Sequence, residues 1–332
     1  MYRMELIHMK EKPMLIMMMG ISGSGKSTLA EHICINNGDI DVMEAANRTG
    51  DPIIHSSDDL RAELYGDANE QSKNDDLFIE LHRRIKRDLA NGKSVIYDAT
   101  NLNKKRRAAF LSELKNIQCE KVCVAVMTTY EACLANNAKR DRKVPDKVIK
   151  RQFFNWQPPH YNDGFDVIWF VFPQGEGYDC KQYVHDASYE NLKLFDQENH
   201  NHALTLGDHC LKVYEYCKEK APDNKMLQTA AYLHDIGKLY TKTHINKKGV
   251  DDGNAHYYQH ECVGAYVAAF VLHDMDYPVN DTLDAINLIF YHMRPYMSWK
   301  DSEKAKERDA FILGKELFED VLLLHEADVA AH

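Results

Sequence analysis

A glycine-rich loop near the start of the chain carries the residue types that hold nucleotide phosphates. Residues 20–27 read GISGSGKS and fit the pattern GxxxxGKS. In this pattern the glycines let backbone N–H groups face the phosphates, the lysine reaches phosphate oxygens, and the following hydroxyl binds Mg²⁺. The expected nucleotide-binding residues are Gly20, Ser22, Gly23, Ser24, Gly25, Lys26, Ser27 and Thr28. We therefore predict that ATP or another nucleoside triphosphate binds here together with Mg²⁺.

Further polar groups follow the next two strands that the pattern predicts. Asp58 and Arg61 lie in the order SDDLR, and Asp98 follows the third apolar run. An aspartate at a strand end can take the proton from an attacking hydroxyl, and an arginine one helical turn later can hold a phosphate beside it. Arg140 and Arg142 lie in the basic segment KRDRKVP. This segment is typical of a lid that closes over phosphates and stabilises charge in the transition state.

A second pattern, rich in histidine, marks the other half of the chain. Of the 17 histidines, 12 come after residue 180, and His234 and Asp235 follow an apolar helical stretch. Each further candidate ligand stands on a separate predicted helical segment; they are His209, His260, His292 and Asp328. Imidazoles and carboxylates that converge from several helices suit Zn, Mn, Fe, Co or Ni.

Three other histidines leave the ligand set open. His200 and His202 are alternatives to His209 as the first ligand, although His209 has the apolar neighbours expected inside a helix. His256 is four residues from His260 and would share its helix face.

The apolar pattern indicates which elements position these groups. Short apolar strands at 14–19, 53–55, 94–97, 121–127 and 167–172 alternate with helical segments, which predicts a parallel sheet flanked by helices. After a break at 173–177, amphipathic segments follow at 204–220, 225–237, 257–273, 281–293 and 306–331. A length of 332 residues also suits two domains. We predict an α/β domain over 1–180 and an all-α domain over 181–332.

Charge and composition limit the class of protein. The net charge of −10 argues against a sequence-blind nucleic-acid coat. Residues 83–151, however, hold 18 basic and 7 acidic residues, a net of +11, which could form a positive path for a phosphate backbone. A solvated helix face is the alternative interpretation for the basic residues at 83–87.

The cysteines and the apolar run near the start of the chain indicate the compartment. The eight cysteines form no CxxC pair, and a chain of this length can build a core without disulfides. The apolar run at 14–19 is far too short to span a bilayer and continues into the glycine loop. We expect a cytoplasmic protein that does not contact a membrane.

The segments GSGKS, SDDLR, DATNLN and KRDRKVP together resemble the polynucleotide 5′-kinase family, the kinase module of nucleic-acid end-repair enzymes. The resemblance covers about residues 14–172. It implies that Asp58 is the general base for a 5′-hydroxyl and that Arg61 contacts a phosphate of the acceptor nucleotide. It also implies that Asp98 supports the site. Arg140 would be a lid arginine that acts on the transferring phosphate, and Lys26 would contact the same phosphate.

The resemblance departs from the family at one lid position. A second family arginine would fall at Asn136, so that its contact is either lost or taken over by Arg142. Related small-molecule kinases share acceptor elements of this kind, so the motif set does not by itself define a polymeric acceptor.

The pattern H…HD…H…H…D resembles the HD phosphohydrolase superfamily over about residues 200–332. The resemblance implies a core of four metal ligands and a second metal held by two more histidines; the ligands are His209, His234, Asp235 and Asp328, then His260 and His292. Such metals activate water for attack on phosphorus. Lys238 and Arg294 are candidates to bind the substrate phosphate.

Together the two halves predict a bifunctional end-healing enzyme. The first half would phosphorylate 5′-hydroxyl ends with ATP, and the second would remove phosphate from 3′-phosphate or 2′,3′-cyclic phosphate ends. RNA is the favoured substrate, an RNA ligase would act downstream, and a homo-oligomer is compatible with the sequence. Two alternatives remain: a nucleoside or metabolite kinase fused to a nucleotide phosphohydrolase, and a nucleotide switch with a non-catalytic HD module.

Overall fold

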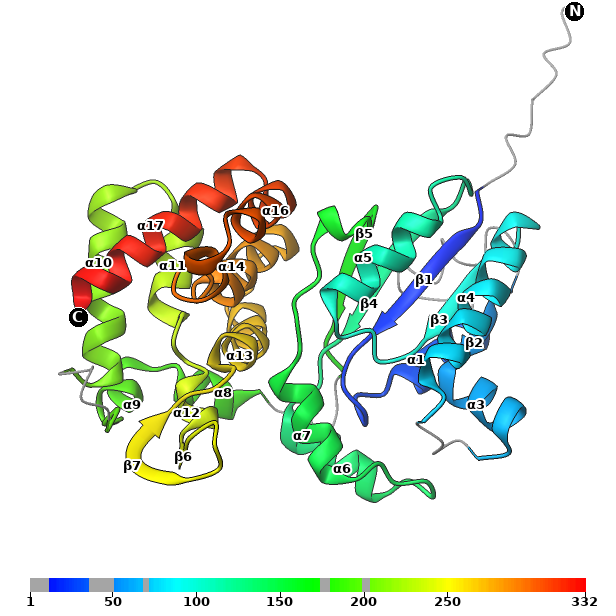
Figure 1. Cartoon of the computed structure of the whole chain (residues 1–332), viewed down its shortest axis with the longest axis horizontal. Coiled ribbons are helices and arrows are strands. Elements are labelled where there is room, and N and C mark those ends of the chain that lie inside the picture. Colours follow the sequence, from blue (N-terminus) through cyan, green and yellow to red (C-terminus); the bar gives the residue numbers. More distant parts are fainter. Residues whose placement is uncertain (1–11, 36–50, 68–71, 174–179, 199–203) are drawn as a thin grey trace, which may run out of the picture.

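Two regions of different architecture lie next to each other in the computed structural model, which describes residues 12–35, 51–67, 72–173, 180–198 and 204–332 (Figure 1). The first region is built on a sheet of five parallel strands in the order β2-β3-β1-β4-β5. The strands are β1 (Met14–Met19), β2 (Ile53–Ser56), β3 (Val95–Asp98), β4 (Glu120–Val126) and β5 (Val167–Val171). The predicted parallel sheet is confirmed.

The central strand β1 is covered on both faces, which explains its unbroken apolar sequence. Its side chains at 14, 16 and 18 pack with Ala30 and Ile33 of α1 (Lys26–Ile35). Those at 15, 17 and 19 pack in a second cluster with Leu81 of α4 (Asn74–Ala90) and Phe110 of α5 (Lys104–Glu113). All six residues are buried.

Parallel pairing brings the carboxyl ends of β1, β2 and β3 to one edge of the sheet. The register pairs Ser56, the last residue of β2, with Asp98, the last residue of β3. β1 leads into α1, and β2 leads into α3 (Ser57–Tyr65). The rest of this region comprises α6 (Tyr130–Ala138), α7 (Asp146–Phe154) and a 3-10 helix η1 (Tyr161–Asp163).

The second region is a group of helices with one small hairpin. Its helices are α8 (Lys181–Asp186), α9 (Tyr189–Lys193), α10 (Leu206–Lys220), α11 (Lys225–Leu233), α12 (Lys238–Thr241), α13 (His260–Asp274), α14 (Val279–Tyr291), α15 (Ser298–Asp301), α16 (Glu303–Leu313) and α17 (Lys315–Ala331). Among the residues that the structure describes, no helix is long and apolar enough to cross a membrane.

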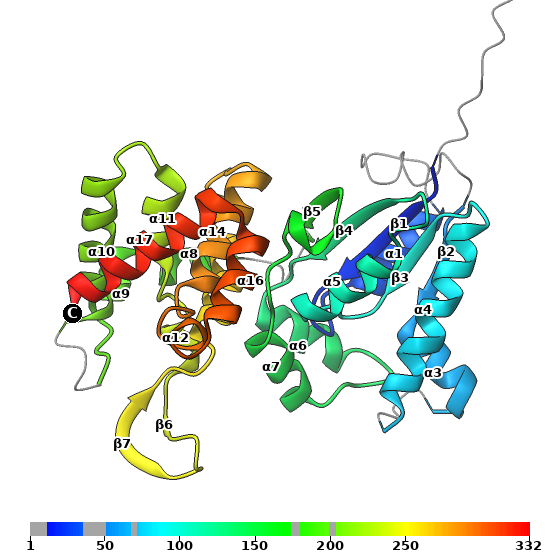
Figure 2. The same ribbon diagram turned by 45° about the horizontal axis from the view of Figure 1, so that its top comes forward.

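The helical prediction for this region needs three corrections. An antiparallel hairpin, β6 (Thr243–Ile245) and β7 (Asp251–His256), interrupts the helices and extends away from them in both views (Figures 1 and 2). The helix expected over 225–237 ends at Leu233, and residues 234–237 form a turn. The single helix expected over 306–331 is divided at Gly314, whose φ of 75° lies in the left-handed region that ends helices.

The two regions share one apolar core. The ring of Tyr266 on α13 lies edge-on to Phe153 and to Trp156, at 5.2 Å between ring centroids in each case. Farther along α13, the ring of His273 stacks on Phe172 at 3.7 Å. The largest cluster of buried apolar side chains therefore runs continuously from the sheet into the helices.

Candidate active sites

The glycine-rich loop joins β1 to α1, the context that the motif requires. Gly23 has φ 86°, and a Cβ placed there would lie 2.2 Å from the carbonyl oxygen of Cys133, so only glycine fits. Lys26 is 8% exposed, and its Nζ donates a hydrogen bond to the carbonyl oxygen of Ile21 at 2.8 Å. Burial lowers the pKa of Lys26, although the nearby Asp98 carboxylate opposes the shift.

Ser27 and Asp98 present a pair of oxygen ligands beside this loop. The Ser27 Oγ donates to Asp98 Oδ2 at 2.7 Å. Burial raises the pKa of Asp98, and Lys26 and the Ser27 hydroxyl act against that change. A hydroxyl and a carboxylate next to phosphate-binding N–H groups fit Mg²⁺, which prefers oxygen ligands.

The predicted general base is held between two arginines. Ser56 caps α3 by accepting hydrogen bonds from the backbone N–H groups of Asp58 and Asp59, which fixes Asp58 in the first turn. Asp58 Oδ1 accepts from Arg61 Nη1 at 2.8 Å, and Oδ2 accepts from Arg142 Nη1 at 2.7 Å. Each carboxylate oxygen therefore has its own guanidinium partner.

Asn136 and Arg142 make different contacts. The Asn136 side-chain amide donates to the carbonyl oxygen of Gly23 at 3.0 Å, while Arg142 reaches Asp58. Asn136, where the resemblance predicts an arginine, thus contacts the glycine-rich loop through an amide. Arg140 lines the same cleft as Lys26, Asp58 and Arg142, with a volume of about 1220 Å³.

The cleft is strongly cationic. Among the residues that the structure describes, eight basic side chains line it against two acidic ones, Asp58 and Asp98; the basic set is Lys26, Arg61, Arg106, Lys139, Arg140, Arg142, Lys143 and Arg151. The basic residues at 83–87 on α4 do not belong to this lining. Their charges pair with carboxylates, as in the bond from Arg84 Nη2 to Glu63 at 2.6 Å and from Lys86 to Glu113 at 2.6 Å.

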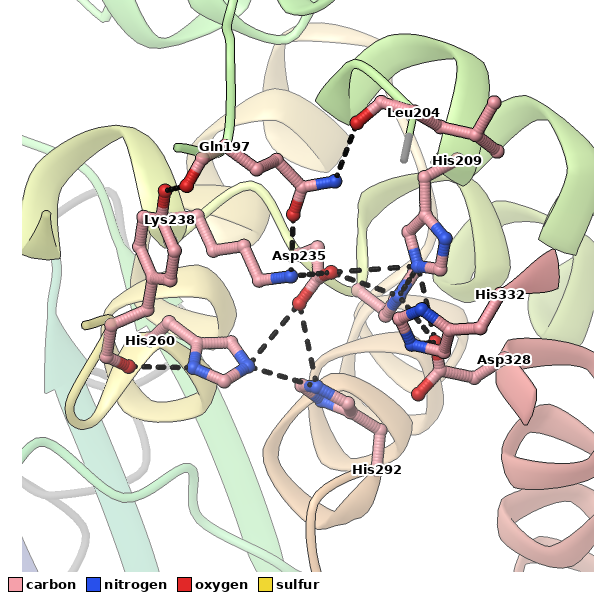
Figure 3. Close-up of polar contacts among 12 residues, drawn as sticks. Gln197, Leu204, His209, Asp235, Lys238, His260, His292, Asp328 and His332 are labelled. Carbon is pink, nitrogen blue, oxygen red and sulfur yellow. Dashed lines mark hydrogen bonds and ion pairs between the residues drawn. The ribbon is translucent and has the colours of Figure 1, made fainter. Parts of the chain in front are cut away.

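The six predicted metal ligands of the second region converge on one buried centre (Figure 3). They come from five helical elements and one turn: His209 from α10, His234 from the end of α11, Asp235 from the turn after it, His260 from the start of α13, His292 from the end of α14, and Asp328 from α17. None of the six is more than 6% exposed.

Asp235 lies between two groups of ligands. Its Oδ2 is 3.3 Å from His234 Nε2 and 3.6 Å from His209 Nε2. Its Oδ1 is 3.2 Å from His260 Nε2 and 3.7 Å from His292 Nε2. Asp328 Oδ1 joins the first group, 3.1 Å from His209 Nε2. The centre thus has two halves that share one carboxylate.

Backbone carbonyls orient the imidazoles. Nδ1 of His234, His260 and His292 bonds to the carbonyl oxygen three residues earlier, at 2.8, 2.7 and 2.6 Å respectively. Because a carbonyl oxygen only accepts, each Nδ1 carries a proton, and Nε2 is the ring nitrogen that faces the centre.

The two carboxylates of the centre are anionic. Burial opposes ionisation of Asp235, but Lys238 and His234 hold its pKa well below the usual value. Burial likewise opposes ionisation of Asp328, and the histidines beside it lower its pKa. Anionic carboxylates and imidazole lone pairs make up a donor set that fits divalent transition metals.

The two predicted phosphate-binding residues have different surroundings. The Lys238 Nζ is buried, 2.6 Å from Asp235 Oδ2, and donates to Gln197 Oε1 at 2.9 Å. Arg294 lies over the rings of Phe290 and Tyr291, at 5.5 and 5.6 Å from their centroids.

Of the three histidines that the sequence left open, the structure describes only His256. His209 lies in the centre, whereas His200 and His202 fall outside the described residues. His256 belongs to β7 rather than to the helix of His260, and it contacts Asp252 at 3.0 Å.

Three neighbours of the centre were missed in the sequence. Gln197 holds Lys238, the Tyr296 hydroxyl donates to Asp328 Oδ2 at 3.0 Å, and His332 Nε2 is 3.6 Å from Asp328 Oδ1. The spacing of four residues between Asp328 and His332 on α17 is a signal that could have found the last of them. Gln197 and Tyr296 reach the centre from irregular segments, which have no periodicity to read.

Comparison with known families now bears on both sites. Residues 15–159 match the family model of an AAA domain, and residues 206–329 match that of the HD domain. The chain joins a P-loop kinase domain to an HD domain. The glycine-rich loop and its cleft fall within the P-loop domain, and all six converging ligands fall within the HD domain.

Solved structures show limited similarity to parts of the chain. One is described as the Pnkp1/Rnl/Hen1 RNA repair complex, with 19% identity over 44% of this chain and 44% of that one, and a TM-score of 0.35. The second is a putative kinase from Chloroflexus aurantiacus J-10-fl, with 14% identity over 48% and 88% of the two chains and a TM-score of 0.35. The third is a gluconokinase from Sinorhizobium meliloti 1021, with 19% identity over 49% and 86% and a TM-score of 0.33.

Proposed function

We propose that the chain is a bifunctional end-healing enzyme for nucleic acids, with RNA as the favoured substrate. The P-loop domain transfers the γ-phosphate of ATP to a 5′-hydroxyl end. The HD domain removes phosphate from a 3′-phosphate or 2′,3′-cyclic phosphate end. Cyclic phosphates form only where a 2′-hydroxyl is present, so this pair of reactions suits RNA.

The observation that carries the kinase assignment is Asp58 clamped by two arginines in the cleft of Lys26. Asp58 takes the proton of the attacking hydroxyl, whose oxygen bonds to the γ-phosphorus as the bond to the β-phosphate oxygen breaks and ADP leaves. Arg61 holds an acceptor phosphate, and Arg142 and Arg140 offset charge on the transferred group.

The excess of basic side chains in the cleft supports a polymeric acceptor. Eight cationic against two acidic side chains exceed what the phosphates of one nucleotide require. Lys143 and Arg151 extend the positive lining along the lid and α7. A phosphate backbone that leads away from the reacting end would neutralise these charges.

The shared carboxylate of Asp235 carries the phosphohydrolase assignment. His209, His234, Asp328 and Asp235 would hold one divalent ion, and Asp235, His260 and His292 would hold a second. Divalent ions bound there, such as Mn, Ni, Co, Fe or Zn, supply the Lewis acidity that activates water and offsets charge on phosphoryl oxygens. Lys238, whose Nζ contacts both Gln197 and Asp235, lies beside the centre where the substrate phosphate would bind.

Transfer of radiolabel from [γ-³²P]ATP tests the kinase assignment. A 5′-hydroxyl oligoribonucleotide should accept the label, and Lys26→Ala or Asp58→Asn should reduce the rate at least about 100-fold. Arg83→Ala is the matched control, because Arg83 pairs with Glu80 on the exposed side of α4. Label found only on nucleosides or sugars would establish the small-molecule alternative instead.

An oligoribonucleotide ending in a 2′,3′-cyclic phosphate tests the second site. Phosphate release should require Mn²⁺, Ni²⁺ or Co²⁺ and should be lost in His234→Ala. His244→Ala is the control, since His244 lies on β6 of the hairpin and pairs with Glu198. Metal-independent release, or none from either end, would refute the phosphohydrolase assignment and favour a non-catalytic HD module.

Two further features remain proposals. Products with a 5′-phosphate and a free 3′-end are the substrates of an RNA ligase, which would act downstream. A functional division near residue 180, and a homo-oligomeric state, are both compatible with this assignment.

A further inference from the structure

A tyrosine outside the ligand set contacts the metal centre from a loop. Tyr296 lies between α14 and α15, four residues after His292, and is 37% exposed. Its hydroxyl donates to Asp328 Oδ2 at 3.0 Å. Asp328 itself is only 6% exposed.

The two oxygens of Asp328 have different surroundings. Oδ1 faces the histidines, 3.1 Å from His209 Nε2 and 3.8 Å from His234 Nε2. Oδ2 bonds to the Tyr296 hydroxyl. A carboxylate that accepts a hydrogen bond on its outer oxygen is fixed about its terminal torsion, and its inner oxygen stays directed at the ion.

The loop that carries Tyr296 is anchored at both sides. The backbone N–H of Trp299 donates to the Arg294 carbonyl at 3.0 Å, and the Trp299 indole N–H donates to Asp309 Oδ2 at 2.9 Å. The Tyr296 ring packs edge-on against His325 at 4.4 Å between centroids. The hydroxyl therefore has a defined position before any ion or substrate binds.

We infer that Tyr296 is a positioning residue of the metal centre, which fixes Asp328 and thereby sets the metal affinity of the half formed with His209, His234 and Asp235. The inference rests on the proposed metal function of the HD domain. Tyr296 also connects the two halves of the centre. It lies on the loop after His292, a ligand of one half, and orients Asp328, a ligand of the other half.

Metal binding by Tyr296→Phe tests this inference. The substitution keeps the ring against His325 and removes only the hydroxyl. We expect Mn²⁺ affinity to fall about 10- to 100-fold, as for loss of other outer partners of metal ligands. Electron paramagnetic resonance measures the free Mn²⁺ during titration of chelator-treated full-length protein. The absorption spectrum of bound Co²⁺ should also shift relative to that of the wild type. Activity lost at limiting Mn²⁺ should return at excess Mn²⁺, which loss of a purely structural contact would not produce.

Tyr216→Phe is the matched control. The Tyr216 hydroxyl also bonds to a carboxylate of α17, that of the exposed Glu326. Its Mn²⁺ affinity should equal that of the wild type, and thermal unfolding in chelator measures what each lost hydrogen bond contributes to stability without metal. Equal affinities of Tyr296→Phe and wild type, or equal losses in both variants, would overturn the inference while wild-type Mn²⁺ uptake remained intact. If wild-type protein bound no Mn²⁺, the proposed metal function itself would fail, and the inference with it.

Discussion

Tyr266 provides a direct test of whether the two domains form one folded unit. It is fully buried on α13, and its hydroxyl donates to the carbonyl oxygen of Thr128 in the P-loop domain at 2.6 Å. The Thr128 Oγ1 in turn donates to the carbonyl oxygen of Ser24 at 2.8 Å. Tyr266→Phe removes this hydrogen bond between the domains and keeps the ring packing.

The expected cost follows from what the Thr128 carbonyl loses. A buried acceptor left without its donor costs about 1–3 kcal/mol. The weak Cys133 thiol donor, 3.4 Å from the same oxygen, remains and offsets part of this cost. We therefore expect the free energy of unfolding to fall by about 1.5 kcal/mol.

Urea denaturation followed by circular dichroism measures this loss, and Tyr161→Phe is the control. The Tyr161 hydroxyl also crosses between domains, to Asn280 Oδ1 at 2.9 Å, but at an exposed position. Its removal should cost less than about 0.5 kcal/mol. Because the core is continuous, we expect a single transition. Equal losses in the two variants, or separate transitions of the two domains, would refute the argument that a shared core joins them.

Three further predictions concern the P-loop domain. Gly23→Ala should abolish binding of an ATP analogue in calorimetry, because it adds a contact of 2.2 Å with the Cys133 carbonyl to about 1–3 kcal/mol of backbone strain; unchanged affinity would contradict the loop geometry. Arg142→Ala should lower kcat about 100-fold. It should cost less than about 1 kcal/mol of stability, since the ion pair of Arg142 with Asp58 is partly exposed. Kinetics and denaturation on the same sample measure both effects. Burial lowers the pKa of His82 to about 4, below its unfolded value of about 6.5. The neutral ring therefore stabilises the fold above pH 6.5, and this contribution is lost as pH falls toward 4. His82→Gln should flatten the dependence of Tm on pH in that interval.

The positions of the reacting groups could be predicted where chemistry and periodicity coincide. The glycine-rich loop stands between a buried strand and a helix, and Asp58 and Asp98 follow strands whose carboxyl ends must meet at one edge of a parallel sheet. The convergence of the histidine pattern was also expected, because the four candidate ligands besides His234 and Asp235 each stand on a separate amphipathic segment.

Contacts that depend on tertiary packing were not predictable. The charge of 83–151 suggested one basic path, but the residues of α4 pair with carboxylates that include Glu63 and Glu113, which lie far away in the sequence. Six of the eight basic residues of the cleft nevertheless lie within 83–151, on α5, the lid and α7, and the other two are Lys26 and Arg61. The hairpin at 243–256 was missed because polar residues at 246–249 make its turn, with Gly249 at φ 79°, and its strands lack a buried face.

The HD domain is attached to the P-loop domain through α13 as well as through the chain connection. The first residue of α13 is His260, and Tyr266 follows six residues later, about 9 Å along the helix axis. Gly237, two residues after Asp235, lies so close to this helix that a Cβ there would be 2.0 Å from the His260 carbonyl oxygen. The approach of these backbones fixes the distance between two ligands of the metal centre, and Tyr266 fixes the same helix to the strand end that supports the glycine-rich loop. The spacing of the two candidate active sites is therefore determined by packed side chains of a shared core, and a change at Gly237 or Tyr266 acts on the geometry that relates them.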